Sequence, residues 1–161
     1  AHLEYLPLPG ADSATRNPWR IAVGYAESLG LDIAGLPFFE SLDSQSVSIV
    51  RQQVQKKLNS PLTSSMGRLF DAISSLIGIR NQVTHEAQAA IEMEVLAKKF
   101  IAEANPYPFE IEDGIIRVGE LFKHVIQDVR SGQAAGFIGA RFHHTVCALS
   151  LIHISEPTRP Y

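Results

Sequence analysis

The sequence predicts a helix-rich α/β or α+β fold, and three observations support that prediction. Six segments carry apolar residues at the three- and four-residue spacing of an amphipathic helix. Only two stretches have the alternating or turn-linked pattern of short strands. With 45% hydrophobic and 19% charged residues the composition is that of a globular protein, and 161 residues suffice for one domain or for a piece of a larger one.

The first part of the chain is expected to form a strand and then a helix. Residues 2–8 alternate apolar and polar positions and read as a strand that ends in a Pro/Gly-rich turn. A loop is expected at 11–16. Asn17 is suited to cap the following helix and Pro18 to occupy its first position, because proline lacks an N–H group that would be unpaired there. Gly30 is suited to end this helix.

Two more helices are expected before residue 78, after an irregular stretch at 31–42. Asp43 can cap the first of them, since its side chain can accept hydrogen bonds from the free N–H groups of a first turn. Apolar side chains at helical spacing define the faces that these helices bury. They are Val47, Val50, Val54 and Leu58 in the first helix, and Met66, Leu69, Phe70, Ile73, Leu76 and Ile77 in the second.

The second half of the chain is expected to contain one long helix, a hairpin and two further helices. Residues 86–104 read as the long helix, and four of its side chains are expected in the core: Ile91, Val95, Phe100 and Ile101. The pair Asp113-Gly114 fits the left-handed positions of a tight turn and predicts a hairpin over 109–117. A clean apolar stripe predicts a helix over 118–131, and the last helix starts near Gln133.

Charge and composition exclude several classes of function. The formal net charge of −3 argues against a nucleic-acid partner, and no apolar run approaches the roughly 20 residues that a membrane-spanning helix needs. Cys147 is the single cysteine, so a reducing, cytoplasmic location is expected, with the thiol buried and inert. The neighbouring His143 and His144 would point about 100° apart on a helix, and no local metal motif is formed.

The start of the helix at 63–77 has the features of an anion site. Thr63, Ser64 and Ser65 can accept hydrogen bonds from its first turn, and Gly67 is a poor helix former that suggests close approach of another group. Free N–H groups and the helix dipole favour negative charge at such a position. The alternative is a plain helix cap, with Arg68 forming an ordinary surface ion pair one turn along the helix.

Three long segments together resemble the HypF carbamoyltransferase family. They are AHLEYLPLPGADSATRNPWRIAVGY at 1–25, LTSSMGRLFDAISSLIGI at 62–79 and VTHEAQAAIEMEVLA at 83–97, and RFHHTV at 141–146 fits the same family. The part resembled is the large C-terminal domain, which is similar to the TsaD-like tRNA threonylcarbamoyltransferases. The resemblance therefore implies a helix-rich α/β part of an actin-like ATPase (ASKHA) domain, in which two related lobes enclose a nucleotide cleft.

The resemblance also implies a reaction. In this family carbamoyl phosphate and ATP give carbamoyl-adenylate, and the carbamoyl group passes to the C-terminal cysteine of the partner HypE, on the way to the cyanide ligand of nickel–iron hydrogenases. AMP is a good leaving group, so the protein's task is positioning and charge stabilisation. ATP or carbamoyl-adenylate is the implied bound nucleotide. The parent is implied to hold zinc or iron, with ligands outside this chain, so no metal ligand is expected here.

Matching motifs imply which residues bind the nucleotide or carbamoyl-adenylate. Asp71 in GRLFDA corresponds to an acid beside the ribose or adenylate, with Ser65 and Gly67 at the start of its helix. Glu86 and Gln88 correspond to the family's YEGQ motif, in which Glu is suited to ribose hydroxyls. This sequence departs from the family at three positions: His85 replaces Tyr, Ala87 replaces Gly, and Ala11 replaces one Gly of PLPGGD. Alanine would weaken binding if positive φ or close approach is needed there.

The resemblance is expected to cover residues 1–149 as part of the carbamoyltransferase domain. The last stretch, SLIHISEPTRPY at 150–161, has no helical stripe and resembles the translation of a sequencing-library adaptor, so we expect a non-native tail, with a genuine polar tail as the alternative. The fragment alone is expected to bind no metal and to catalyse no transfer. Two other functions stay open: an O-carbamoyltransferase acting on a small-molecule hydroxyl, and a non-catalytic ATPase-like binding module, which His85 and Ala87 favour.

Overall fold

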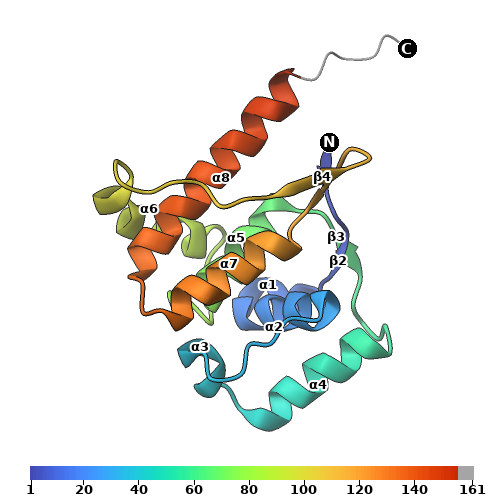
Figure 1. Ribbon diagram of the computed structural model, residues 1–161. Coiled ribbons are helices and arrows are strands. Elements are labelled where there is room, and N and C mark those ends of the chain that lie inside the picture. The colour runs from blue at the N-terminus through green and yellow to red at the C-terminus, as the bar shows by residue number, and fades with distance from the viewer. Residues whose placement is uncertain (156–161) are drawn as a thin grey trace.

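Helix α2 (Pro18–Leu29) lies at the centre of the computed structural model, which describes residues 1–155 (Figure 1). Eight of its first nine residues are buried, and α5 (Met66–Leu76) and α4 (Ser44–Gln55) pack against it. The predicted start at Pro18 and the predicted end at Gly30 (φ 66°) are confirmed. Asn17 does not cap the helix. Its Nδ2 donates backwards to the carbonyl of Ser13 at 2.8 Å, so the amide closes the preceding turn.

Two small sheets flank the helices. β1 (His2–Leu3) pairs in parallel with β5 (Ile115–Arg117), and β5 pairs antiparallel with β4 (Glu110–Glu112), so the order is β1-β5-β4. The second sheet joins β2 (Leu6–Pro7) to β3 (Leu62–Thr63). The hairpin predicted around Asp113-Gly114 is confirmed, with φ of 52° and 77° at the turn. The single strand predicted at 2–8 is wrong, because the chain changes partner between Leu3 and Leu6.

The segments beside α2 are more helical than the sequence pattern suggested. A loop was expected at 11–16, but α1 (Asp12–Arg16) forms there and buries Ala14. The stretch at 31–42 contains the short helix α3 (Pro37–Glu40). In α4 the cap prediction is confirmed, since the Asp43 carboxylate accepts from the Ser46 N–H at 2.9 Å. Leu58 was expected in the core, but it follows the end of α4 and is exposed.

Helix α5 is buried on more than its apolar face. Ser65 caps it, because its Oγ accepts from the Arg68 N–H at 3.4 Å, and the predicted stripe packs into the core through Leu69, Ile73 and Leu76. The opposite face carries the polar residues, yet Asp71, Ser74 and Ser75 are buried as well. The reason is that α2, α6 (Gln88–Ala97) and α7 (Gly119–Arg130) all pack against this helix.

The long helix expected at 86–104 is shorter and faces the core with different residues. It comprises α6 (Gln88–Ala97) and one 3-10 turn, Lys98–Phe100. The expected core residues Ile91, Val95 and Ile101 are 52%, 58% and 40% exposed. Instead Ala89, Met93 and Ala97 are buried at the contact with α8 (Ala135–Ser155), which presents glycines to them. Small residues allow the two backbones to approach more closely than the larger aliphatic side chains would.

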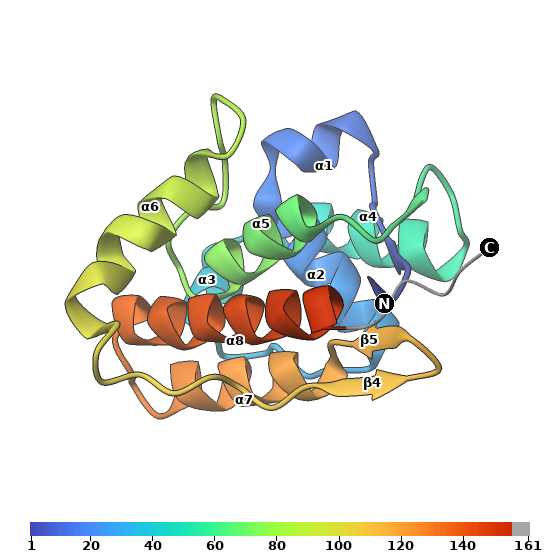
Figure 2. The same cartoon turned by 90° about the horizontal axis from the view of Figure 1, so that it is seen from above.

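Helices α7 (Gly119–Arg130) and α8 cover one side of the molecule and run side by side (Figure 2). The segment between α6 and β4 is tied to both, because the Tyr107 hydroxyl donates to Asp128 of α7 at 2.6 Å and the Tyr107 N–H donates to the Thr145 hydroxyl of α8 at 2.8 Å. Cys147 on α8 is exposed, so the expected burial of its thiol is wrong. Among residues 1–155 no helix is long and apolar enough to cross a membrane.

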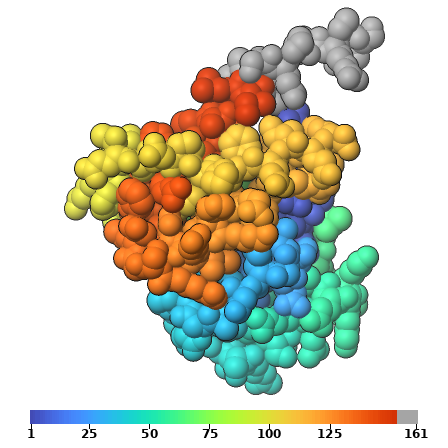
Figure 3. Space-filling model, viewed as in Figure 1, coloured from blue at the N-terminus to red at the C-terminus, as the bar shows by residue number. Residues whose placement is uncertain are grey.

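The C-terminal part of α8 bears on the predicted domain boundary. Leu149 is buried, whereas Ser150 and Leu151 are exposed, and in the space-filling view the end of the helix projects from the body (Figure 3). The helix continues to Ser155, although no helical pattern was expected after residue 149. The remainder of the predicted non-native tail, residues 156–161, lies outside the described residues, so that boundary stays a prediction.

The close contact between α6 and α8 predicts a large effect of one methyl group. A Cβ at Gly136 would lie 2.5 Å from the carbonyl oxygen of Leu96, which is backbone and cannot turn away. We expect Gly136→Ala to lower the free energy of unfolding in urea by about 1–3 kcal/mol, as overpacking does. Gly119→Ala is the matched control, because nothing lies within 4 Å of its Cβ position. An equal effect of both substitutions would contradict the close packing.

Candidate functional site

A cleft of about 380 Å³ lies between the end of α1, the first turns of α5 and the connector that leads to α6. Figure 2 shows this connector rising beside α1. The two walls are joined by a backbone hydrogen bond, in which Val83 N–H donates to the carbonyl of Arg16 at 3.0 Å. The residues that line the cleft are Thr15, Arg16, Arg68, Asp71, Val83, Thr84, His85, Glu86 and Ala87.

Asp71 is the most deeply placed acid of the cleft. Its residue surface is 5% exposed, and its Oδ2 lies 3.1 Å from Nε of Arg68 on the preceding turn. Burial raises the pKa of this carboxyl above its usual value, and the attraction of Arg68 opposes the rise without cancelling it. Burial also raises the pKa of the neighbouring Tyr25 hydroxyl. A buried acid with a perturbed pKa at a cleft is a feature of functional sites.

The connector places Glu86 at the cleft but turns Gln88 away from it. Gln88 is buried, its Oε1 accepts from the Thr84 N–H at 2.8 Å, and its Nε2 donates to Glu92 at 3.1 Å. Glu92 in turn binds Arg80 through two hydrogen bonds of 2.7 and 2.9 Å. The amide of Gln88 therefore shapes the connector, and this residue does not line the cleft.

Ser65 and Gly67 also lie away from the lining of this cleft. The Ser65 hydroxyl is used in capping α5, and the residue borders a much smaller cavity with Leu6 and Tyr25. Gly67 is exposed, and a Cβ there would meet only the Ser65 Oγ at an ordinary 3.5 Å. Of the predicted site residues, the structure brings Asp71 and Glu86 together. The cleft adds Thr15 and Arg16, which pattern analysis missed because residues 11–16 read as a loop.

Ala87 and Ala11, the two alanines that the resemblance implied to stand in place of glycine, adopt positive φ. Ala87 has φ 61° and ψ 4° at the start of α6, and Ala11 has φ 47° at the start of α1. This backbone region is easy for glycine and costs other residues roughly 1–2 kcal/mol. Ala87 lines the cleft directly, and Ala11 precedes the helix that ends at Arg16. Strain of this kind persists only where surrounding contacts hold the backbone in place.

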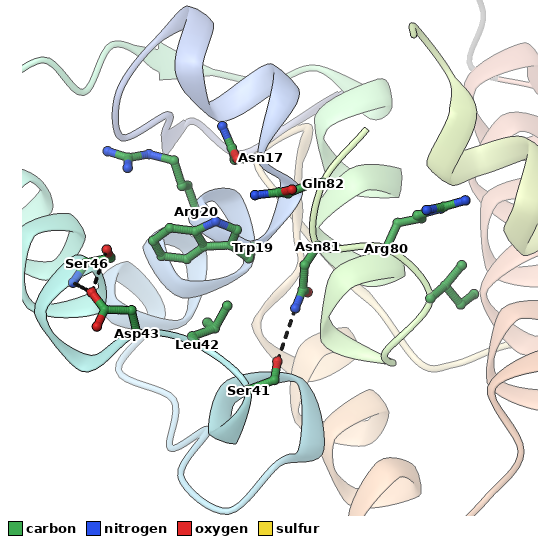
Figure 4. Close-up of a pocket in the computed structure, with 11 residues that line it drawn as sticks. Asn17, Trp19, Arg20, Ser41, Leu42, Asp43, Ser46, Arg80, Asn81 and Gln82 are labelled. Atoms are coloured by element: carbon green, nitrogen blue, oxygen red, sulfur yellow. Dashed lines mark hydrogen bonds between the residues drawn. The ribbon is translucent and has the colours of Figure 1, made fainter. Parts of the chain in front are cut away.

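A second pocket of about 560 Å³ lies on the other side of the connector, beside Trp19 (Figure 4). Several of its polar side chains are already hydrogen-bonded: Asn81 accepts from Ser75 and donates to Ser41 at 3.3 Å, and Ser46 donates to Asp43. We therefore regard the smaller cleft as the candidate site. Within residues 1–155 no three His, Cys, Asp or Glu side chains come together to hold a metal ion.

Comparison with known proteins gives one consistent family. Residues 1–158 match the family described as Carbamoyltransferase, Kae1-like Domain, second subdomain. The chain is 32% identical to the carbamoyltransferase HypF homolog of Cupriavidus necator over 94% of its own length and 40% of that protein. It is 33% identical to carbamoyltransferase HypF of Rhizobium leguminosarum bv. viciae, over 89% of this chain and 18% of that protein.

Solved structures agree with this comparison. The chain is similar to full-length HypF in a phosphate- and nucleotide-bound form, with a TM-score of 0.83, 35% identity, and coverage of 95% of this chain and 24% of that one. HypF of T. kodakarensis gives a TM-score of 0.74 at 27% identity, with coverage of 91% and 20%. The predicted fold class, a helix-rich part of a TsaD-like, actin-like domain, is confirmed. The chain spans less than half the length of these relatives.

The conformation of Ala87 leads to a stability prediction. Ala87→Gly relieves the cost of a left-handed alanine but adds freedom to the unfolded chain, so we expect the free energy of unfolding to rise by about 0.5–1 kcal/mol. Ala90→Gly, three residues further on inside α6, is expected to lower it by about 1 kcal/mol, because glycine is a poor helix former. Urea unfolding of both variants measures this contrast, and a loss of stability in both would contradict it.

The burial of Asp71 predicts how stability depends on pH. Because folding raises the pKa of this carboxyl, the folded state binds its proton more tightly than the unfolded state. The contribution of Asp71 to the free energy of unfolding therefore falls as the pH rises from the pKa of this carboxyl in the unfolded chain to its raised pKa in the folded protein. At higher pH the loss of stability stays constant. The stability of Asp71→Asn minus that of the wild type should accordingly increase from about pH 3.5 to neutral pH. A decrease would mean that Arg68 outweighs burial.

Proposed function

This chain belongs to the HypF carbamoyltransferase family, and we propose that its cleft contributes to nucleotide binding in a parent enzyme that transfers carbamoyl groups. The parent would use carbamoyl phosphate and ATP to form carbamoyl-adenylate, and would pass the carbamoyl group to the C-terminal cysteine of HypE during hydrogenase maturation. Two findings support this proposal: the relatives are named carbamoyltransferases, and one similar structure is described as nucleotide-bound. We place any zinc or iron site of the parent outside this chain.

The observation that carries the proposal is the pairing of Asp71 with Glu86 across one cleft. Ionised carboxylates accept hydrogen bonds only, and each has room for two, so they suit the vicinal hydroxyls of a ribose. Asp71 is shielded from water, which strengthens any hydrogen bond that it accepts. Glu86 lies on the exposed connector, where a ligand that enters the cleft can reach its carboxylate.

In the proposed transfer, the acceptor thiolate attacks the carbamoyl carbon, the bond from that carbon to the phosphate oxygen breaks, and AMP leaves with the electron pair. The residues of this chain touch the nucleoside part and not the reacting carbon. Their contribution is to hold the adenylate in place, so that the carbamoyl group meets the acceptor in a fixed geometry. We accordingly assign Asp71 and Glu86 to binding, and no residue of this chain to proton transfer or nucleophilic attack.

A second candidate function is a nucleotide-binding module without catalysis. His85 and Ala87 favour it, because both depart from the family motif and both line the cleft. If Ala87 weakens the site, Ala87→Gly in the full-length protein should raise its ATP affinity, whereas an unchanged affinity would remove the support that this substitution gives to the alternative. A further alternative is transfer to a small-molecule hydroxyl in place of the HypE cysteine. An assay that offers both acceptors to the parent enzyme would show which of them becomes carbamoylated.

Adenosine titration of this chain tests the proposed function directly. We expect adenosine to bind, and Asp71→Asn to weaken binding by about tenfold, because an amide accepts fewer and weaker hydrogen bonds from ribose hydroxyls than a carboxylate does. Isothermal titration calorimetry measures the affinity. Glu94→Gln is the matched control, since it removes one exposed negative charge on α6 away from the cleft lining. Absence of adenosine binding to the wild type, or equal loss in both variants, would refute the proposal.

A further inference from the structure

Arg16 differs from the other arginines of the described chain. Residues 1–155 contain eight arginines, and seven of them form a hydrogen bond or ion pair through the guanidinium: Arg20, Arg51, Arg68, Arg80, Arg117, Arg130 and Arg141. Within this part of the protein Arg16 alone has no such partner, although it lines the cleft. Arg16 is exposed and lines the cleft, so a cation without a protein partner is available there to a ligand.

Glu86 is unpaired in the same cleft. It faces the site from the connector, and within residues 1–155 its carboxylate takes part in no hydrogen bond or ion pair. Arg16 and Glu86 therefore carry opposite charges on opposite walls without forming an ion pair, so their charged atoms are more than 4.0 Å apart. A ligand that offers an anion to one side and hydroxyl donors to the other can bridge this separation.

The backbone around Arg16 holds the residue at the cleft at some cost. Helix α1 has five residues, buries only Ala14, and begins at Ala11 with positive φ. It adds little to the core, so burial alone gives a weak reason for the segment to be ordered. Its last residue is nevertheless fixed, because the carbonyl of Arg16 accepts the Val83 N–H from the opposite wall. This bond sets the position of Arg16 relative to Thr84, His85 and Glu86.

We propose that Arg16 binds the phosphoryl oxygens of a ribonucleoside 5′-phosphate or its acyl ester, while Asp71 and Glu86 bind the ribose hydroxyls. This inference rests on the proposed nucleotide function and extends it by naming the part of the substrate that each wall recognises. Arg68 is already engaged by Asp71, so the planar, permanently charged guanidinium of Arg16 is the free cation of this cleft. Arg16 is a binding and positioning residue that contacts no reacting carbon.

The experiment compares adenosine with AMP as calorimetric probes of the wild type and of Arg16→Gln. Adenosine reports the hydroxyl side of the cleft, and AMP adds the phosphate. We expect the wild type to bind AMP about tenfold more tightly than adenosine, which corresponds to one charge-assisted contact. Arg16→Gln should abolish this preference and leave the adenosine affinity unchanged, and Arg16→Lys should retain part of it because the charge is kept.

Lys56→Gln controls for the loss of one positive charge, because this exposed residue at the end of α4 does not line the cleft. Equal AMP and adenosine affinities in the wild type, or an AMP preference that survives Arg16→Gln, would overturn the role of Arg16 while leaving the proposed nucleotide function intact. An equal reduction of AMP binding by Lys56→Gln would also overturn it, since the effect would then be one of net charge. Failure of both ligands to bind would remove the proposed function itself.

Discussion

The packing of α2 against α5 is the contact on which the rest of this structure depends. The buried length of α2 places Tyr25 near Arg68 and Asp71 of α5, and Asp71 is itself buried there. The start of α2 also fixes the end of α1, and the end of α5 leads into the connector that forms the other wall. A change in the spacing of these two helices would therefore move all three walls of the cleft, because interiors are close-packed and transmit shifts.

The sequence predicted correctly several helix starts and ends and one tight turn, because residues close together in the chain determine these features. Pro18, Gly30, Asp43, Ser65 and the Asp113-Gly114 turn each act within a few residues of the chain, and the structure places all of them as expected. The face of α6 was misjudged, because its residues are apolar on several sides. Which side is buried is decided by the glycines of α8, about 40 residues away in the chain, and no local pattern contains that information.

In the candidate site, too, some features follow from local sequence and others depend on residues far along the chain. The family motifs pointed to Asp71 and Glu86, which the fold brings to one cleft, and to Ser65, Gly67 and Gln88, which do not line it. The side chains of Ser65 and Gln88 accept hydrogen bonds from nearby backbone N–H groups, as hydroxyls at helix starts and amides in turns often do. Arg16 could not be recognised from the sequence, because its position depends on a hydrogen bond to Val83, far along the chain.

The two pockets differ less in volume than in whether their polar side chains already have hydrogen-bond or ion-pair partners in the protein. The larger pocket beside Trp19 contains amides and hydroxyls that already bind one another, so a ligand would have to break protein hydrogen bonds to make its own. The smaller cleft leaves Arg16 and Glu86 unpaired on facing walls, so a ligand there need not break a protein hydrogen bond of either side chain. Ala87, which lines the same cleft, is held at positive φ, and the fold maintains this backbone against the preference of the residue. A cleft that combines free charges with a backbone held in a costly conformation is shaped for a ligand, whereas a larger cavity of satisfied groups is adequately explained by imperfect packing between helices.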